Sequence, residues 1–292
     1  MIISHIIGGL GNQMFQYASG RALSLERGVP FKLDTQDFEG YALHNGFELD
    51  RIFEVQAPLA EESDIKSVLG WRAHPLFRRR LFRKQLEILR GSRLFVDTQF
   101  SSWREIAEVP DHCYLMGNWQ TEMYFKKHEE TIRSDLSFKR PLVDKNRTVA
   151  DQIGDSVAVS LHVRRGDIAA NPASLAFHGL CSLEYYKRAV DHITARVANP
   201  EFYIFSDDMP WVKENISISH PCHYIDHNKG SESYNDMHLM SLCRHHIIAN
   251  SSFSWWGAWL NPKEEKIVVA PALWFSAEFD SSDIIPSNWV KL

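Results

Sequence analysis

The sequence predicts an α/β fold built from two Rossmann-like halves. Three observations support this. The chain opens with an apolar run, a glycine turn and a helical pattern; its second half alternates short apolar runs with helical patterns; and polar residues 139–147 separate the halves. A chain of 292 residues is long enough for two such domains. We therefore expect one domain over residues 1–145 and a second over residues 146–292, with the last residues able to return and pack on the first.

The chain begins with a strand, a turn and a helix. Apolar residues 2–7 predict the strand, glycine-rich residues 8–11 the turn, and residues 12–27 a helix with Asn12 as its N-cap. A Gly-Val-Pro triplet ends this helix, and residues 31–33 predict a second strand. A strand–helix–strand start indicates a parallel sheet.

The rest of the first half is predicted to be mainly helical. Residues 60–95 have a helical and strongly basic pattern, residues 113–116 predict a strand, and a helix follows from Met123 to about Leu136. The basic run from Arg78 to Lys84 is either a solvated helix face or a surface for a membrane or an acidic partner.

The second half alternates regularly between strands and helices, which predicts a second Rossmann-like unit. The expected strands lie near residues 156–161, 201–206, 222–225, 246–250 and 266–270. The expected helices lie near residues 182–197, 208–215, 233–244 and 254–260.

Composition and charge exclude several classes of protein. The formal net charge is −5, so nucleic-acid binding is not expected. The first apolar run is too short for a signal peptide, and no run approaches the roughly 20 apolar residues of a membrane span. The four cysteines lack metal-ligand spacing, which favours buried free thiols in a reducing compartment and hence a cytoplasmic protein.

The most informative motif runs from His162 through Arg164 and Arg165 to Asp167, directly after the apolar run 156–161. In open α/β sheets, ligands bind outside the carboxyl ends of the strands. A guanidinium group presents a fork of donors that matches phosphate oxygens. The motif is either a diphosphate clamp or a surface arginine pair that forms salt bridges with Asp167.

Two further motifs follow predicted strands. The turn that contains Gly9, Gly11, Asn12 and Gln13 is a candidate phosphate or sugar cradle, because glycines let backbone N–H groups approach a ligand. It matches neither a dinucleotide-binding fingerprint nor a P-loop. The adjacent pair Asp207-Asp208 offers one carboxylate to a base or ribose and another to cap a helix, and it lacks the spacing of a metal site.

The fourth motif opens a helix with Asn250, Ser251, Ser252 and Phe253. Serine hydroxyls and the N–H groups of a helix N-terminus favour an anion. The tryptophans that follow are either sugar platforms or core residues. Because all four motifs suit an anion or a nucleotide, they predict a diphosphate-linked ligand between the two halves and transfer of the group that it carries.

Six segments together resemble the bacterial α-1,2-fucosyltransferases. They lie in order at residues 8–18, 117–125, 162–167, 177–186, 205–208 and 250–260. The wider superfamily includes α-1,6- and protein O-fucosyltransferases, so the resemblance implies a GT-B fold with the ligand cleft between two lobes. It also implies GDP-β-L-fucose as donor, inversion at the anomeric carbon, transfer to O2 of a galactose in an acceptor glycan, and no metal or other cofactor.

The resemblance also assigns roles to single residues. Arg164 matches an essential arginine that contacts the diphosphate, and Arg165 assists it. His162 and one aspartate of the pair Asp207-Asp208 match positions that hold guanine. The remaining matches are Asn12, near the sugar and phosphate, and the loop of Ser251, Ser252 and Phe253, which binds phosphate and packs on the nucleotide.

The general base and the acceptor stay open. Candidates for the base are Asp37, Glu48, Asp167 and His178, with a slight preference for His178; a mechanism without a dedicated base is the alternative. Two other functions are a nucleotide-sugar-binding module without transfer and a transferase of another linkage or sugar. If the galactose-terminated acceptor is lipid-linked, the basic segment 72–93 would contact the inner membrane surface.

Overall fold

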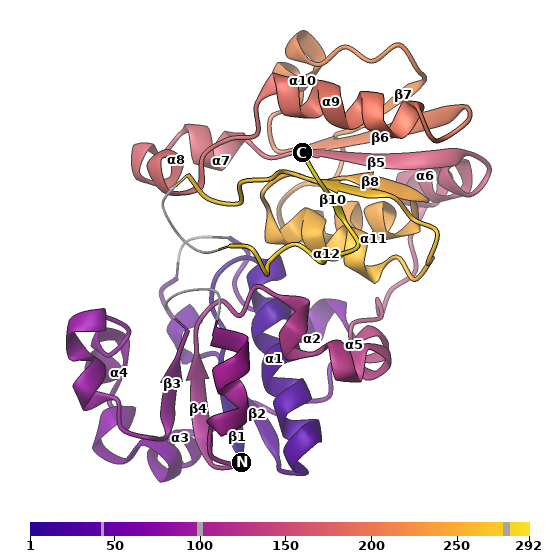
Figure 1. Cartoon of the computed structure of the whole chain (residues 1–292). Helices are drawn as coiled ribbons and strands as arrows, with labels where there is room; N and C mark the ends of the chain where they lie inside the picture. The colour runs from indigo at the N-terminus through magenta and orange to yellow at the C-terminus, as the bar shows by residue number, and fades with distance from the viewer. Residues whose placement is uncertain (42–43, 98–101, 277–280) are drawn as a thin grey trace. The chain divides into compact units, whose positions relative to one another are not determined.

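A computed structural model of the chain describes residues 1–41, 44–97, 102–276 and 281–292. Contacts divide it into two compact units (Figure 1). Unit 1 comprises Met1–Lys139 with Ser282–Ile284, and unit 2 comprises Arg140–Ser281 with Ile285–Leu292. The units meet between Lys139 and Arg140, a few residues before the expected boundary at residue 145. The end of the polar stretch 139–147 belongs to helix α6 (Asp144–Gly154) of unit 2.

Unit 1 contains a four-stranded parallel sheet in the order β2-β1-β4-β3. Its strands are β1 (Ile2–His5), β2 (Phe31–Asp34), β3 (Leu94–Val96) and β4 (Cys113–Met116). The predicted parallel start is confirmed, since Ile2 pairs with Phe31 on one side and with Cys113 on the other. The sequence reading missed β3, which is only three residues long.

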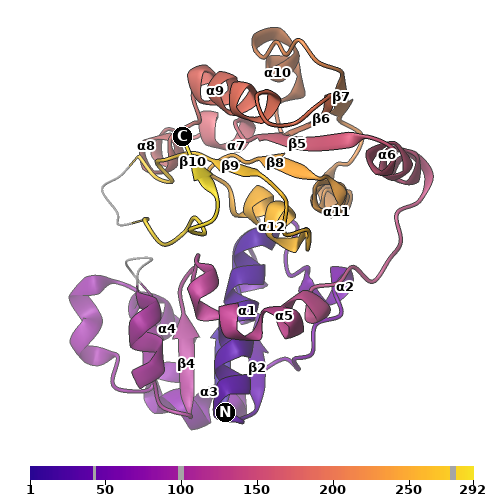
Figure 2. The ribbon, with the colours of Figure 1, turned by 45° about the vertical axis from the view of Figure 1, so that its right-hand side comes forward.

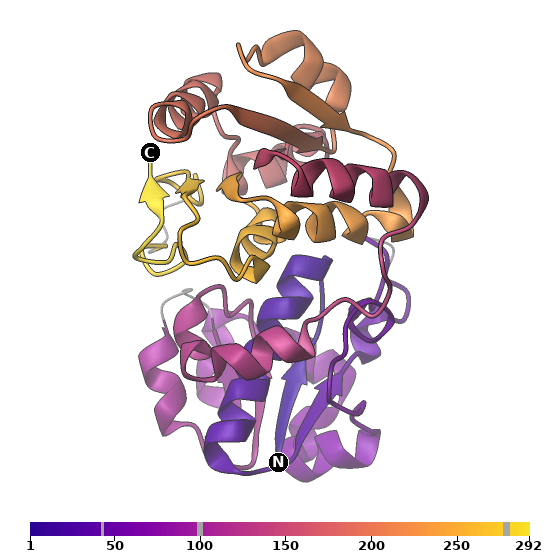
Figure 3. The same ribbon diagram turned by 90° about the vertical axis from the view of Figure 1, so that its right-hand side faces the viewer.

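Helix α1 (Leu10–Arg27) lies along strands β1 and β2 and is coloured indigo with them in Figure 3. Its N-cap is Gly9; Asn12 lies in the first turn, so the expected cap at Asn12 is wrong. The helix approaches the sheet closely at Gly20, where an added Cβ would lie 2.5 Å from the ring of Phe31. Gly28 ends it in the left-handed conformation, as its place before Val-Pro predicts.

The basic segment folds into short pieces rather than one helix. These pieces are α3 (Glu62–Leu69), η2 (Gly70–Ala73), α4 (Pro75–Arg80) and η3 (Lys84–Leu89). Gly70 has φ 58° and Pro75 begins α4, so each interrupts a continuous helix.

The basic run is not a uniform surface. The Arg78 side chain is fully buried and lies 3.1 Å from the equally buried Asp34 carboxylate. Its guanidinium group also lies over the ring of Tyr114, whose hydroxyl donates to Asp34. Arg78 therefore belongs to neither a solvated face nor a membrane surface, because the end of β2 supplies a buried acid that the sequence alone does not place beside it.

Shorter elements complete unit 1. They are η1 (Gln36–Phe38), α2 (Leu49–Ile52), η4 (Ser102–Glu108), η5 (Glu122–Tyr124), η6 (Lys126–His128) and α5 (Glu129–Asp135). The last three replace the single helix expected from Met123. The returning segment 282–284 is held through Asp283, which accepts hydrogen bonds from the Trp103 indole at 2.8 Å and, on its backbone, from Thr121 at 2.6 Å.

Unit 2 contains a six-stranded parallel sheet in the order β10-β9-β8-β5-β6-β7. Its strands are β5 (Val157–Val163), β6 (Pro200–Ser206), β7 (Cys222–Ile225), β8 (His245–Ile247), β9 (Val268–Ala270) and β10 (Val290–Lys291). Five of these strands were predicted; the two-residue β10 was not.

Helices cover both faces of this sheet (Figure 2). Val159 and Leu161 pack against α9 (Leu183–Thr194) and α10 (Met209–Asn215), while Ala158 faces α6 and α11 (Tyr234–Leu242). This alternation along β5 explains its continuous apolar sequence. The other helices are α7 (Gly166–Ala169), α8 (Pro172–His178), η7 (Gly230–Glu232) and α12 (Ser252–Leu260).

The four cysteines are free, as predicted. Cys113 and Cys243 are buried, whereas Cys181 and Cys222 are partly exposed. Among the helices in the described part of the chain, none is long and apolar enough to cross a membrane.

Candidate functional site

Three of the sequence motifs meet at one edge of the unit 2 sheet. Strand β5 pairs with β6 on one side and β8 on the other, all parallel, so the loops after these strands lie next to each other. At this edge the Arg164 guanidinium donates to the Ser251 hydroxyl, with 3.3 Å between Nη1 and Oγ. Arg164 is partly exposed. The arginine loop and the serine loop thus form one cationic, donor-rich surface.

Arg165 connects this loop with the loop after β6. Its backbone N–H donates to Asp207 at 2.8 Å, its Nε lies 3.5 Å from the Asp208 carboxylate, and its guanidinium group lies 4.5 Å from the centre of the Trp211 ring. Gly166 permits this arrangement, because a Cβ there would lie 3.2 Å from the Asp207 carbonyl oxygen. These contacts make Arg165 the fixed member of the arginine pair.

One aspartate of the pair caps a helix, as the sequence predicts. Asp208 is the N-cap of α10 and accepts from the Trp211 N–H at 3.3 Å. Asp207 is not the cap; its Oδ1 holds the arginine loop. Both carboxylates face the loop after β5, at the same sheet edge as Arg164.

His162 and Phe253 approach each other across the edge. The His162 side chain is buried at the end of β5, and its ring centre lies 6.0 Å from that of Phe253 in the first turn of α12. Ser251 is the N-cap residue of α12, and its side chain accepts no capping bond. The first turn of α12 has no acidic residue, so its N–H groups present positive potential toward the Arg164 loop.

Asn250 has a different role from the expected ligand contact. Its amide donates to the backbone carbonyls of His178, Gly179 and Trp274 at 2.9, 3.4 and 3.3 Å. Its Oδ1 accepts from the Cys181 thiol at 3.4 Å, and burial raises the pKa of that thiol to about 11. Asn250 therefore fixes the loop that carries His178, and this use of its amide is not visible in the sequence.

His178 is the last residue of α8. Its ring contacts Phe177 and Phe275, with ring centres 4.8 and 5.8 Å apart. Asp167 lies in α7, and its side chain falls outside the described part of the structure.

The glycine turn of unit 1 is held by buried glutamines. Gln13 is fully buried, donates to the carbonyls of Gly8 and Gly46 at 2.8 Å each, and accepts from the Glu48 N–H at 3.0 Å. Its amide is used within the protein, which corrects its assignment to the ligand. Gly8 has φ 87°, a conformation that favours glycine, and Gly9 lies against the ring of His44. Gly11 is buried in α1.

Asn12 connects the turn with the segment after β4. Its Oδ1 accepts from the Gln120 amide at 2.8 Å. Beside Gln120, Trp119 is fully buried with φ 54° and lies perpendicular to Tyr124, with ring centres 5.3 Å apart. Within the described residues, the Trp119 indole N–H, Gln120 Oε1 and the Tyr124 hydroxyl have no hydrogen-bond partner. Strained backbone and unsatisfied buried polar groups cluster at functional sites, so this segment is a candidate for a functional role.

Three residues that position this region were not singled out from the sequence. Gln16 accepts from the Ile7 N–H at 2.9 Å and donates to the Gly117 carbonyl at 3.1 Å. Asp97 accepts from the Trp119 N–H at 3.2 Å, and Gln120 holds Asn12. Gln16 and Gln120 lie inside the segments that carry the family resemblance, so that signal could have identified them.

The two unit 1 candidates for the general base differ in charge environment. Although burial works the other way, hydrogen bonds from His5 and Arg79 hold the pKa of the Asp37 carboxyl well below its usual range. Burial raises the pKa of the Glu48 carboxyl, although Arg51 at 2.8 Å lowers it. Asp37 is therefore a poor proton acceptor near neutral pH, and Glu48 is a better one.

Comparison with known proteins places this arrangement in a family. The model of glycosyl transferase family 11 matches residues 98–292. The alpha-1,2-colitosyltransferase of Escherichia coli is 36% identical over 297 residues, which cover 100% of this chain and 99% of that protein. The O-antigen biosynthesis glycosyltransferase WbnK of Escherichia coli is 31% identical, over 99% of each chain.

Solved structures confirm the predicted fold class. The fucosyltransferase NodZ from Bradyrhizobium superposes with a TM-score of 0.56 and 14% identity, over 89% of this chain and 93% of NodZ. Its likeness supports the α/β, GT-B-like fold predicted from the sequence. The match over residues 98–292 and the 36% identity to a relative along the whole chain show that the chain is a glycosyltransferase and belongs to glycosyl transferase family 11, the α-1,2-fucosyltransferase family that its motifs resemble.

Proposed function

We propose that the protein moves L-fucose from GDP-β-L-fucose to O2 of a galactose in an acceptor glycan, with inversion and without a divalent metal. The observation that carries the proposal is the contact between Arg164 and Ser251 at the carboxyl edge of the unit 2 sheet. A partly exposed guanidinium beside a serine loop and a helix N-terminus without a side-chain cap suits the negative charge of a diphosphate.

Arg164 acts on the leaving group in this proposal. When the bond between the anomeric carbon and the GDP oxygen breaks, positive charge grows on the sugar ring and negative charge on the diphosphate. The Arg164 guanidinium and the first N–H groups of α12 stabilise that negative charge. Arg165 is paired with Asp208, so it positions the loop and leaves the neutralisation to Arg164.

The nucleoside is assigned to the neighbouring residues. His162 and Phe253 supply aromatic faces at the same edge. Asp207 accepts from the Arg165 N–H, and a carboxylate has about four lone-pair sites, so we assign it to the guanine N–H groups as well. In unit 1, Asn12, held by Gln120, is assigned to the sugar and phosphate.

We assign the general base to His178. An imidazole is half protonated near neutral pH, which suits proton removal from a sugar hydroxyl. Asn250 fixes the backbone carbonyl of His178 at 2.9 Å, so this residue is anchored to the serine loop. The alternatives are Glu48 as the base and a mechanism without a dedicated base. The pH–rate profile of a His178→Gln variant tests them: if His178 is the base, the limb of the profile that reports its titration disappears, and if either alternative holds, that limb remains.

A donor other than GDP-fucose is favoured by one observation, the 36% identity to an alpha-1,2-colitosyltransferase. Colitose lacks one hydroxyl of fucose. A site that hydrogen-bonds this hydroxyl would reject the deoxy sugar by about 10⁴-fold, whereas a site that only surrounds it discriminates about 100-fold or less. The ratio of the two rates therefore identifies the native donor.

The acceptor is proposed to be a galactose-terminated glycan on a lipid carrier at the cytoplasmic face of the membrane. Similarity to an O-antigen biosynthesis glycosyltransferase supports this class of acceptor.

The test is GDP release from GDP-fucose and GDP-colitose, with lactose or N-acetyllactosamine as acceptor and excess chelator, for the wild type and Arg164→Ala. Chelator-resistant, acceptor-dependent release from GDP-fucose that disappears in the variant supports the proposal. Faster release from GDP-colitose assigns the other donor. Tight GDP-fucose binding without release with any galactoside supports a binding module instead, and dependence on added metal contradicts metal independence.

A further inference from the structure

Unit 1 exposes an unusual group of large apolar side chains. Of the fourteen large hydrophobic residues exposed in the described part of the chain, six lie between residues 71 and 89. They are Trp71, Leu76, Phe77, Phe82, Ile88 and Leu89, and Ile88 is 91% exposed. Single exposed apolar residues are ordinary, but a group of this kind marks an interaction site.

Contacts connect the short helical pieces that carry these side chains. The rings of Trp71 and Phe77 meet edge to face with centres 5.8 Å apart, and the Arg72 guanidinium lies 4.7 Å from the centre of the Trp71 ring. Arg72 donates to the Leu89 carbonyl at 2.5 Å. The neighbouring Arg90 donates to the carbonyls of Leu81 and Phe82. The pieces η2, α4 and η3 are therefore held together, and each exposes apolar residues.

The same segment carries a strong positive charge. Residues 71–93 contain eight of the chain's 32 lysines and arginines but only one of its 37 acidic residues, Glu87, on a chain whose net charge is −5. Arg78 and Arg79 are paired with Asp34 and Asp37, so their charges are neutralised locally. Four other arginines of the same segment are at least partly exposed: Arg72, Arg80, Arg83 and Arg93.

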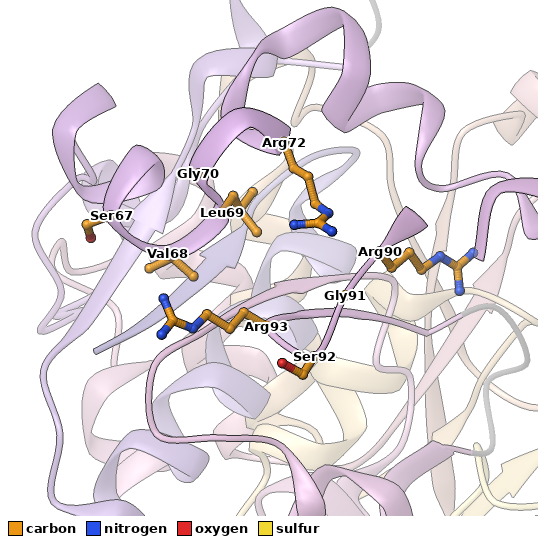
Figure 4. A pocket seen from close by; sticks show the side chains of 9 residues that line it. All are labelled: Ser67, Val68, Leu69, Gly70, Arg72, Arg90, Gly91, Ser92 and Arg93. Carbon is orange, nitrogen blue, oxygen red and sulfur yellow. The ribbon is translucent and has the colours of Figure 1, made fainter. Parts of the chain in front are cut away.

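A basic groove lies beside the apolar group (Figure 4). It has a volume of about 410 Å³ and is lined by residues 67–70, Arg72 and residues 90–93. The close-up shows Arg72 and Arg93 extending along the groove, whereas the Arg90 side chain points away from it. The Arg72 guanidinium lies against Gly91, where an added Cβ would be 3.1 Å from Nη2. The groove thus presents arginine side chains to an anionic group.

The surface is firmly attached to its unit. Leu81 and Ala73 are buried in the same core cluster as Leu94 and Tyr114 of the sheet, and the buried Arg78 pairs with Asp34 at the end of β2. Figure 1 shows α4 at the margin of unit 1, beyond the edge strand β3. The apolar side chains therefore project from a fixed support.

We propose that this surface, defined by Trp71, Phe77, Phe82 and Ile88 with Arg72, Arg80, Arg83 and Arg93, docks unit 1 on an anionic phospholipid bilayer. The apolar side chains enter the interface between headgroups and acyl chains, the surrounding arginines attract the negative surface, and the groove takes a lipid phosphate. Charge complementarity selects this partner: the exposed or partly exposed Arg72, Arg80, Arg83 and Arg93 share one segment with exposed aromatic residues and match a negatively charged membrane, whereas a second copy of this chain would present the same positive charge. The inference holds for any donor and acceptor sugar.

The test is flotation of the full chain with vesicles of phosphatidylcholine alone or with added phosphatidylglycerol, at low and high salt. Two pairs of substitutions probe the surface: Phe77→Ser with Ile88→Ser, and Arg83→Gln with Arg93→Gln. Matched controls in unit 2 are Leu242→Ser with Leu273→Ser, which are exposed apolar residues, and Arg147→Gln with Lys187→Gln. Leu76→Ser is a further single change at an exposed position.

The wild type is expected to bind phosphatidylglycerol vesicles, and less so at high salt. Loss of two arginines lowers the partition coefficient by roughly 30-fold, and loss of two apolar side chains by about tenfold or more, while the unit 2 controls bind as the wild type. Absence of binding at low salt overturns the proposal. The proposal is also overturned if the wild type does not bind vesicles but forms a dimer that the double substitution Phe77→Ser with Ile88→Ser dissociates. It is likewise overturned if inorganic phosphate abolishes vesicle binding while the apolar substitutions leave it intact.

Discussion

The chain has two arginine clusters, Arg78 with Arg79 in unit 1 and Arg164 with Arg165 in unit 2, and they differ in how their charges are used. In unit 1, Arg78 is withdrawn into the interior, where it lies 3.1 Å from the buried Asp34. In unit 2, Arg164 stays partly exposed and donates to Ser251. Both clusters read as anion sites by composition. The difference teaches that the position of an arginine after a strand, and the acids already beside it, decide whether its charge is available to a ligand.

Within each cluster the neighbouring acids select which arginine is used structurally. Asp34 and Asp37, after β2, pair with Arg78 and Arg79. Asp208, after β6, pairs with Arg165. Arg164 is partly exposed and donates to the Ser251 hydroxyl of the serine loop, which is why we assign ligand binding to it.

The largest expected effect is on the stability of unit 1. Arg78→Leu leaves the Asp34 carboxylate buried without its ion pair and should lower the free energy of unfolding by about 3–5 kcal/mol. Arg80→Leu, two residues away on the exposed side of α4, should change it by no more than about 0.5 kcal/mol. Denaturant unfolding of the two variants compares them directly, and equal losses would show that Arg78 is not a buried partner of Asp34.

The next effect is on transfer and leaves stability unchanged. Arg164→Gln removes the guanidinium charge from the proposed diphosphate site and should lower the transfer rate by about 10²–10³-fold. Arg147→Gln, an exposed helix arginine paired with Asp151, is the matched control and should transfer at the wild-type rate. An Arg164→Gln variant whose melting temperature falls along with its activity would indicate a structural role like that of Arg78.

The sequence predicts the strand ends better than it predicts what surrounds them. Apolar runs located β5 and β8, and the parallel pairing of these strands then brings Arg164 and Ser251 together. The burial of Arg78 and the use of the Asn250 amide by three loop carbonyls depend on tertiary neighbours, so no local pattern announces them. Gly70 and Pro75 are helix breakers that the sequence itself contains, but the helical pattern over residues 60–95 does not show that the chain breaks at both.

Two carboxyl groups, Asp37 in unit 1 and Asp236 in unit 2, have pKa values shifted in opposite directions. Asp37, among cations, has a pKa below its usual range, whereas burial raises the pKa of Asp236 to about 7, although a hydrogen bond from Asn228 at 2.7 Å opposes this. Between the ordinary value of 3.8 and about 7, the folded state holds a proton on Asp236 that the unfolded state has lost, so stability falls as the pH rises through this window.

Asp236→Asn removes this titration and keeps an oxygen that accepts from Asn228. The variant should gain about 1.4 kcal/mol of stability relative to the wild type for each pH unit between about 4 and about 7, and the difference should stay constant above. Urea unfolding across this range measures the difference. A wild-type advantage that grows with pH would mean that the Asp236 carboxylate is stabilised by its surroundings and not penalised by burial.

The smallest effect concerns the hydrogen bond between Asn12 and Gln120 in unit 1. Its length is 2.8 Å and, unlike the ion pairs of the arginine clusters, it joins two neutral side chains. A double-mutant cycle with Asn12→Ala and Gln120→Ala should give a coupling of about 0.5–1.5 kcal/mol in transfer, since neither partner carries charge. If Gln120 acts only by positioning Asn12, the double variant should be no slower than Asn12→Ala. Additive losses would instead show that Gln120 contributes through its own buried Oε1, which has no partner among the described residues and is then free to meet a substrate hydroxyl.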